Sequence, residues 1–329
     1  MDRSTQASPA HSTSSASASA SAAGPTPPHR LSAIIDALPL TVLTLVLAIW
    51  WLGWPGIANS DGEVPPLTQV DAASAEQLEG VFTQAGYFWP SREIPPLALQ
   101  DLPADLATIA ADQRKSLFFR ALLPMVLAEN ERISEQRNRL MNALDANTPT
   151  PRHEIVLRRL TQAYGIDGDP LDAQTQAALK DAVDEVPVAL ALAQAAKESG
   201  WGTSRFAIEG NNLFGQWTWT ASRGLKPKDR AEDATHYVRV FKNLRQSVRS
   251  YMHNLNSHDA YAEFRALRAQ ARAEGERLSP ELMTTGLDRY SERGEAYVEE
   301  IQAMIHNNRL HWLVVGAQLV RDSGRLAAQ

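Results

Sequence analysis

A single glutamate in a segment dense in Gly, Asn and Trp is the strongest candidate for chemistry in this sequence. The segment Ala196–Trp219 reads AKESGWGTSRFAIEGNNLFGQWTW, so Glu198 directly precedes Ser-Gly-Trp-Gly. It also contains three of the eight Trp residues of the chain. This composition is typical either of an irregular turn in the core or of a segment that lines a cleft. The secondary structure expected around the segment helps to distinguish the two.

The residues before Glu198 predict a buried helix that ends close to it. Pro187 is suited to a helix start, and residues 188–196 are apolar nearly all round. Gly200 and Gly202 are expected to end the helix and to leave bare backbone beside the carboxyl group. Because burial and the negative end of a helix dipole both raise a carboxyl pKa, Glu198 could act as a general acid. The alternative is an ordinary solvated Glu at a frayed helix end.

Aromatic and amide side chains around Glu198 could bind a sugar. Gln194 and Trp201 lie four residues before and three residues after Glu198, so we expect both on its helix face. Trp217 and Trp219 could stack on sugar rings, although Trp side chains fill cores equally well. The paired Asn suit a turn, which is the more common role of Asn in such a setting. The candidates for substrate binding are Gln194, Trp201, Asn211, Asn212, Phe214 and Trp217.

A glycosidase usually needs a second carboxylate or a substitute for one. Asp229, Glu232 and Asp233 follow in a region that contains one short strand pattern, at 236–241. Nothing intrinsic distinguishes the three acids, and each alone is more typical of a solvated loop. The residues by themselves therefore leave the second group open.

Composition excludes several other classes of chemistry. The net charge is -6, which argues against a nucleic-acid-binding surface. The chain has no Cys, so disulfides, thiolate nucleophiles and Cys-zinc sites are excluded. No His-Glu-x-x-His motif occurs among the eight scattered His residues. We expect no metal and no cofactor.

An apolar block near the N-terminus predicts a membrane anchor. Residues 31–54 end in an uncharged run with three Trp, and about 20 apolar residues suffice to span a bilayer. Two Arg precede the block and two acidic residues follow it at once, which places the N-terminus in the cytoplasm and the rest of the chain outside. A signal peptide cleaved near residues 56–58 is the alternative.

The rest of the chain divides by composition. Residues 1–30 are rich in Ser, Ala and Pro and predict a disordered tail. Prolines in 55–111 predict a mostly extended linker with short helical pieces. A helical segment is expected over 112–150, with its charged part at 129–139 solvated on most faces. The last domain, 151–323, is expected to be mainly α with one short β excursion, its helices at 153–164, 172–183, 187–199, 244–254, 260–273, 280–290 and 295–319.

Longer stretches of the sequence resemble a known family. The segment ALAQAAKESGWGTSRFAIEGNNLFGQW, residues 191–217, resembles the signature of the glucosaminidase family of peptidoglycan hydrolases, glycoside hydrolase family 73, and is most similar to its Bax-type, membrane-associated members. The similarity continues in VFKNLRQSVRSYMHNLNSHDAYAEFRALR (240–268) and YSERGEAYVEEIQAMI (290–305), and upstream in SLFFRALLPMVLAENERISEQR (116–137). It covers roughly residues 87–312.

The resemblance implies a lysozyme-like, mainly α (α+β) fold with a small β lobe. It also implies cleavage of the β-1,4 bond on the reducing side of N-acetylglucosamine in bacterial cell wall. The acid of the family corresponds to Glu198, its second carboxylate is best matched by Glu232, and its cleft tyrosine corresponds to Tyr290. Here that tyrosine opens Tyr-Ser-Glu-Arg-Gly in place of a motif like Tyr-Ala-Thr-Asp-Pro. Either Glu232 activates water for inversion or the substrate's N-acetyl group acts as nucleophile.

The expected partners follow from this resemblance and from the anchor. They are the glycan strands of peptidoglycan and, through the N-terminal helix, the bacterial inner membrane, with the catalytic domain in the periplasm. The alternative function is a non-catalytic, membrane-anchored module that binds cell wall. Such a module would keep the Trp and Asn residues and would need no acid.

Overall fold

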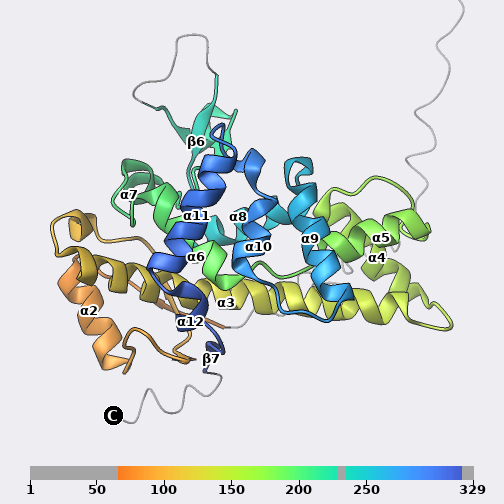
Figure 1. The fold of residues 1–329 in the computed structure, drawn as a ribbon, viewed down its shortest axis with the longest axis horizontal. Helices are drawn as coiled ribbons and strands as arrows, with labels where there is room; N and C mark the ends of the chain where they lie inside the picture. The colour runs from red at the N-terminus through yellow and green to blue at the C-terminus, as the bar shows by residue number, and fades with distance from the viewer. Residues whose placement is uncertain (1–65, 228–234, 321–329) are drawn as a thin grey trace, which may run out of the picture. The chain divides into compact units, whose positions relative to one another are not determined.

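A 34-residue helix, α3 (Ala111–Leu144), is the element against which much of the described part of the chain packs. The computed structural model describes residues 66–227 and 235–320 (Figure 1). Helices α6 (Val188–Ser199) and α8 (Leu244–Ser257) pack directly on α3, which continues through Pro124. Its middle, from Leu117 to Asn130, is buried on all sides, which explains why its sequence shows no narrow apolar stripe.

The remaining elements surround these helices (Figure 1). The other α-helices are α2 (Ala75–Gln84), α4 (Pro151–Tyr164), α5 (Ala173–Ala182), α7 (Arg205–Gly210), α9 (Ala262–Ala273), α10 (Pro280–Thr285), α11 (Glu295–Asn307) and α12 (Leu310–Leu313). Short 3-10 turns are η2 (Ala104–Ala107), η3 (Ala221–Arg223), η4 (Asp259–Tyr261) and η5 (Asp288–Tyr290). The strands are β1 (Thr68–Val70), β2 (Glu93–Ile94), β3 (Leu97–Leu99), β4 (Trp217–Thr218), β5 (Gly224–Leu225), β6 (Tyr237–Arg239) and β7 (Gln318–Leu319).

Helix α6 begins and ends where its sequence predicts. Pro187 is its N-cap residue, and Gly200 is its C-cap residue in the left-handed conformation, with φ 58°. Its apolar residues are buried against α3, α10 and α11. This packing fixes the last turn of the helix, and with it the backbone of Glu198.

A small antiparallel sheet forms the β lobe. Its strand order is β4-β6-β5, and Trp217 is paired with Val238. In Figure 1 the sheet lies beyond one end of α6, at the top of the view. The prediction of a mainly α fold with a small β lobe is therefore confirmed.

The segment predicted as an extended linker is part of the core instead. Helix α2 buries Leu78 and Phe82, and Tyr87 after it is also buried. Strands β1 and β3 pair in parallel, and β3 packs on α3. The described prolines of this segment, from Pro66 on, lie outside helices and strands, while the apolar residues between them still pack inward. Neither residue 111 nor residue 150 is thus a domain boundary, because the described residues on both sides of each belong to one compact unit.

The charged half of α3 was expected to be solvated, and this expectation is wrong. Glu129 is fully buried, and its carboxylate accepts from Nε of Arg132 at 2.8 Å. Arg245 and Arg249 of α8 also pair with it, through Nε at 2.8 and 3.0 Å. The buried charge of Glu129 on α3 is therefore neutralised in part by α8, which lies more than a hundred residues later in the chain. The periodicity of α3 alone does not reveal these partners.

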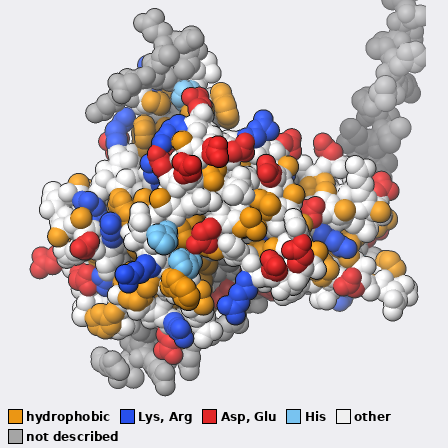
Figure 2. All heavy atoms as spheres, in the orientation of Figure 1, with side chains coloured by type: hydrophobic (Ala, Val, Ile, Leu, Met, Phe, Trp, Pro, Cys, Tyr) orange, Lys and Arg blue, Asp and Glu red, His pale blue; other side chains and the backbone are white. Residues whose placement is uncertain are grey.

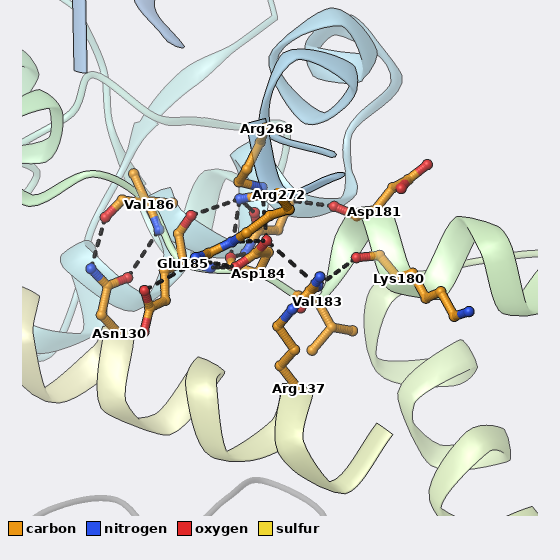
Figure 3. A network of polar contacts seen from close by, with 11 residues as sticks. Asn130, Arg137, Lys180, Asp181, Val183, Asp184, Glu185, Val186, Arg268 and Arg272 are labelled. Atoms are coloured by element: carbon orange, nitrogen blue, oxygen red, sulfur yellow. Dashed lines mark hydrogen bonds and ion pairs between the residues drawn. The ribbon is translucent and has the colours of Figure 1, made fainter. Parts of the chain in front are cut away.

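A second buried carboxylate holds the connection between α5 and α6 (Figure 3). Asp184 is 2% exposed, and Nη2 of Arg272 donates to its Oδ1 at 2.8 Å. Arg137 lies 3.5 Å from its other oxygen. Nη1 of Arg268 donates to the backbone carbonyls of Asp184 and Glu185 at 3.0 and 2.9 Å.

The ionised form of Asp184 is the stable one in this network. Burial alone would raise its pKa, but the hydrogen bond from Arg272 and the charges of Arg268 and Arg137 lower the pKa below its ordinary value. Next to it, the side chain of Asn130 on α3 exchanges two hydrogen bonds with the backbone of Val186, at 2.7 and 3.0 Å. The start of α6 is thus fixed to α3 and α9 by polar contacts.

The last described strand, β7, pairs with β2, which lies before α3. A continuous helix was predicted over 295–319, but α11 ends at Asn307 and Arg309 adopts a left-handed conformation with φ 52°. Strand β7 then pairs in parallel with β2, with Ile94 opposite Leu319. The pairing joins the end of the described chain to the segment that precedes α3.

Membrane association is not visible in the described residues. Among them, no helix combines the length and the apolar composition needed to cross a bilayer. The predicted tail at 1–30 and the predicted anchor at 31–54 both lie outside the described residues.

Candidate active site

A cleft of about 890 Å³ opens beside the C-terminal end of α6. Glu198 lies on one side of it, and the β lobe contributes Trp217 and Arg239. Helix α8 and the turn around Tyr290 complete the wall. The cleft therefore gathers residues from elements that are separated by up to about a hundred positions in the sequence.

Glu198 is partly buried and faces this cleft. Burial raises its pKa above the ordinary value for a Glu side chain. A hydrogen-bonding contact with the hydroxyl of Tyr297 and the positive charges of Lys197 and Arg293 oppose this rise without cancelling it. A carboxyl group with these properties holds its proton to higher pH than a solvated one, as a general acid requires.

Gly215 gives access to this carboxyl group. A Cβ atom at Gly215 would lie 3.5 Å from Oε2 of Glu198, and its φ of 68° favours glycine. Gly202, in contrast, faces the core, because a Cβ atom there would lie 2.7 Å from Leu102. The expectation that Gly202 exposes backbone to a ligand is wrong. The glycine whose backbone lies open beside the Glu198 carboxyl group is Gly215.

Four tyrosines surround Glu198. The ring of Tyr290 stacks on that of Tyr297, with centroids 5.4 Å apart, and contacts Tyr261 at 5.7 Å. Tyr251 stacks on Phe214 at 3.9 Å. These rings form the apolar surroundings that desolvate the acid.

Tyr290, predicted from the family motif, does lie in the cleft. Its hydroxyl donates to the backbone carbonyl of Phe214 at 3.0 Å. Tyr290 thereby holds the turn that carries Phe214 and Gly215 next to Glu198. Phe214 itself lines the cleft but is almost fully buried.

Tyr297 is the residue beside Glu198 that sequence reasoning missed. It lies on the buried face of α11, in phase with Ile301 and Ile305. The helical spacing could have predicted that Tyr297 points inward. Only the packing of α11 on α6 shows that its hydroxyl meets a carboxyl group.

The β lobe presents two exposed tryptophans to the cleft. Trp217 is 54% exposed and Trp219 is 72% exposed, and both line it. The imidazole of His236 stacks on Trp217 with centroids 4.2 Å apart. Such exposed flat rings next to an acid fit a ligand with apolar faces, such as a sugar.

Gln194 does not line the cleft. Its side chain is fully buried, accepts from the hydroxyl of Tyr251 at 2.6 Å and donates to the hydroxyl of Tyr297 at 2.8 Å. Its position on the same helix face as Glu198 places it one turn deeper in the protein. The side chain that was predicted to bind substrate is therefore placed behind the wall of the cleft.

Trp201 is also placed away from the cleft. Its ring contacts Phe118 and Phe119 of α3, at 6.0 and 5.3 Å, and Nζ of Lys115 lies 5.1 Å from the ring centroid. Its backbone is left-handed, with φ 60°, so the chain turns away after Gly200 and carries the side chain to α3. Trp201 is a packing residue.

The Asn pair builds the turn that follows α7. Asn211 is the left-handed C-cap of that helix, and its Nδ2 donates to Asp101 at 2.6 Å. Asn212 donates through Nδ2 to the backbone carbonyls of Gln216 and Arg239, both at 2.8 Å. Both side chains are buried, so turn formation is confirmed and the structure shows no contact of either with the cleft.

The three candidates for the second carboxylate lie outside the described residues. Asp229, Glu232 and Asp233 fall in the gap at 228–234, between β5 and β6. Both of these strands belong to the β lobe that borders the cleft.

The charges on the face seen in Figure 2 are mixed. Acidic side chains gather over the upper end of α11, with Lys and Arg side chains beside them. Glu295 and Glu299 of this helix are exposed. This face has no continuous basic stripe of the kind that binds a nucleic-acid backbone.

The sequence is similar to known proteins over the region that forms this cleft. The family model named glucosaminidase, described as mannosyl-glycoprotein endo-beta-N-acetylglucosaminidase, matches residues 175–310. Protein bax of Escherichia coli (strain K12) is 31% identical over 201 residues, which is 60% of this chain and 70% of that protein. No solved structure matches the chain. The matched region includes Glu198, the β lobe and the four tyrosines.

Proposed function

Because the chain belongs to the glucosaminidase family, as a Bax-type member, we propose that it hydrolyses the β-1,4 bond on the reducing side of N-acetylglucosamine in bacterial peptidoglycan. The observation that supports this most is the carboxyl group of Glu198, which is partly buried in a cleft and has a raised pKa. In this proposal Glu198 donates its proton to the glycosidic oxygen as the bond breaks.

The step that follows protonation needs a second group. Glu232 would activate a water molecule on the opposite face of the sugar, which inverts the anomeric carbon. Alternatively, the N-acetyl oxygen of the substrate attacks that carbon and water opens the resulting ring, which retains the configuration. We favour Glu232, because its segment connects two strands of the lobe that borders the cleft.

Two measurements on the same preparation test the activity. Purified cell-wall sacculi incubated with the protein should lose turbidity, and mass spectrometry of the products should show new reducing ends at N-acetylglucosamine. Sacculi that bind the protein but release no fragments would instead identify a non-catalytic wall-binding module.

Glu232→Gln should lower the hydrolysis rate at least tenfold, because the attacking water loses its base. The matched controls are Asp229→Asn and Asp233→Asn, which make the same chemical change in the same segment. A much larger loss in Asp233→Asn would assign the role to that residue. Proton NMR of the first product anomer separates the two routes, since inversion requires the Glu232 mechanism.

Trp217→Ala should raise KM about 2- to 10-fold with a smaller effect on kcat, because a sugar ring loses its stacking surface. Trp312→Ala is the matched control, since Trp312 is 73% exposed and does not line the cleft. Steady-state kinetics on soluble glycan fragments measure both variants. Equal KM values for the two variants would remove Trp217 from the binding surface.

We propose that the protein acts in the periplasm, anchored to the inner membrane by residues 31–54. The apolar run and the distribution of charges around it support this. The substrate named above lies on that side of the membrane, so anchor and activity are compatible.

A further inference from the structure

Two arginines line the cleft, and they differ in whether a carboxylate already compensates their charge. Arg293, in the turn before α11, pairs with Glu300. Arg239, on β6, forms no ion pair with any residue that the structure describes, and its side chain has one hydrogen-bond partner, the hydroxyl of Ser250. The charge of Arg239 is therefore available to a ligand in the cleft.

Arg239 is held in place at both its backbone and its side chain. Its N–H donates to the carbonyl of Gln216 at 2.8 Å, and its own carbonyl accepts from Nδ2 of Asn212 at 2.8 Å. The central carbon of its guanidinium lies 4.9 Å from the ring centroid of Phe241, and Nη1 donates to Oγ of Ser250 on α8 at 3.2 Å. The guanidinium is thus oriented by a ring on one face and a hydroxyl at one edge, between the β lobe and α8.

Most donors of this guanidinium are not used by the protein. An Arg side chain has five N–H donors in a planar fork, and the described contacts of Arg239 use one of them, for Ser250. The residue is exposed, so the other donors are accessible. Parallel pairs of such N–H groups match the two oxygens of a carboxylate. An oriented and unpaired guanidinium in a cleft therefore fits a ligand that carries a carboxylate.

The part of α8 beside Arg239 has a further donor. Oγ of Ser250 accepts from Arg239, so its own proton is available to a ligand. His253 also lines the cleft, but its Nε2 donates to the carbonyl of Ala163 at 2.7 Å. The described carboxylates of the cleft, Glu198 and Glu292, come from α6 and from the turn before α11. The described wall that β6 and α8 form thus has a positive charge and no acid.

We propose that Arg239 and Ser250 form a subsite for a carboxylate of the substrate. The identity of that substrate rests on the proposed function. In peptidoglycan, alternate sugars carry a lactyl group whose carboxyl is either free or amide-linked to a peptide with carboxylates of its own. Arg239 and Trp217 come from paired strands and line the same cleft, so a sugar on the Trp217 ring has this subsite nearby. The subsite favours acid-bearing glycans over neutral glycans with the same bond.

The test measures binding separately from hydrolysis. The full chain with Glu198→Gln, which should not cut the ligands, is titrated calorimetrically with three soluble ligands. They are peptidoglycan fragments without peptides, the same fragments with their peptides, and oligomers of N-acetylglucosamine. The first carries the lactyl carboxylate, the second carries peptide carboxylates, and the third carries none.

Addition of Arg239→Gln should raise the Kd of at least one acid-bearing ligand about 10-fold, because charge-assisted hydrogen bonds are lost. The Kd of the neutral oligomer should not change. A loss confined to the peptide-free fragment assigns the subsite to the lactyl carboxylate, and a loss confined to the peptide-bearing fragment assigns it to the peptide. Unchanged Kd values for both acid-bearing ligands, no binding of either, or an equal loss for the neutral oligomer would overturn the proposal.

The matched control is Arg223→Gln. Arg223 ends η3 in the same lobe, is exposed and does not line the cleft, so this variant loses the same charge at a different place. It should leave all three Kd values unchanged. If Arg239→Gln does not fold, Ser250→Ala removes the hydroxyl that orients the guanidinium. Weaker binding of an acid-bearing ligand by that variant supports the subsite, and an unchanged Kd overturns it.

The subsite and the proposed function can fail independently. Hydrolysis of sacculi is measured on the chain that keeps Glu198. A protein that releases no fragments but binds acid-bearing glycans through Arg239 keeps the subsite and loses the proposed function. A protein that hydrolyses cell wall and shows the same Kd values with and without Arg239→Gln keeps the function and loses the subsite.

Discussion

Replacement of Glu198 by Gln should reduce cell-wall hydrolysis about 10²- to 10⁴-fold while the fold survives. The amide keeps the size of the side chain but cannot donate a proton to a glycosidic oxygen. The residual rate would come from binding and from the rest of the cleft. Turbidity loss of sacculi, followed over a range of enzyme concentrations, measures the ratio to wild type.

The matched control for this substitution is Glu209→Gln. Glu209 lies on α7, pairs with Arg205 at 2.9 Å and is not part of the cleft. Because exposed ion pairs contribute little, this variant should keep wild-type activity and stability. Circular dichroism establishes that both variants are folded. Wild-type hydrolysis by a folded Glu198→Gln protein would refute the role of Glu198.

Asp184→Asn should lower the free energy of unfolding by about 3–5 kcal/mol, because it leaves the buried Arg268 and the partly exposed Arg137 and Arg272 without their counter-charge. The change removes no volume, so a cavity cannot explain the loss. Urea unfolding at neutral pH measures it. The matched control is Asp181→Asn, since the Asp181 side chain is exposed and only its backbone carbonyl accepts from Arg268, at 2.7 Å (Figure 3). That variant should differ from wild type by less than about 0.5 kcal/mol.

The contribution of Asp184 should also depend on pH in a defined direction. Its pKa is lowered in the folded protein, so its stabilising effect is complete above the ordinary carboxyl pKa of about 4 and is lost as pH falls through the lower folded-state value. The difference between wild type and Asp184→Asn should therefore be constant from about pH 5 to about pH 8 and shrink below about pH 4. A difference that grows on acidification would contradict the assignment of Asp184 as the ionised partner.

Local patterns in the sequence were enough to predict the element that carries the acid. An apolar run that begins after Pro187 and ends before Gly200 is typical of a buried helix, and this places Glu198 at its end. The two glycines after it looked equivalent in sequence. All three residues from Gly200 to Gly202 are left-handed, and the side chains that Gly202 faces, Leu102 and Phe118, lie far away in the chain.

Polar residues on buried faces could not be assigned from the sequence. Gln194 shares a helix face with Glu198, and this suggested substrate binding. The hydroxyl groups that satisfy it come from α8 and α11, at distances of 57 and 103 residues along the chain. Glu129 is a similar case, because its arginine partners on α8 are 116 and 120 residues away. Periodicity shows that a position faces inward, but it does not identify the partner that makes burial tolerable.

The packing of α6 on α3 limits which part of this protein could be transferred to another gene as a folded module. The family match at 175–310 begins inside α5 and excludes α3, on which α6 packs. A gene fusion that transferred only the matched stretch would carry α6 away from the helix that covers its apolar side. A transferable piece would therefore need α3 in addition to the matched stretch.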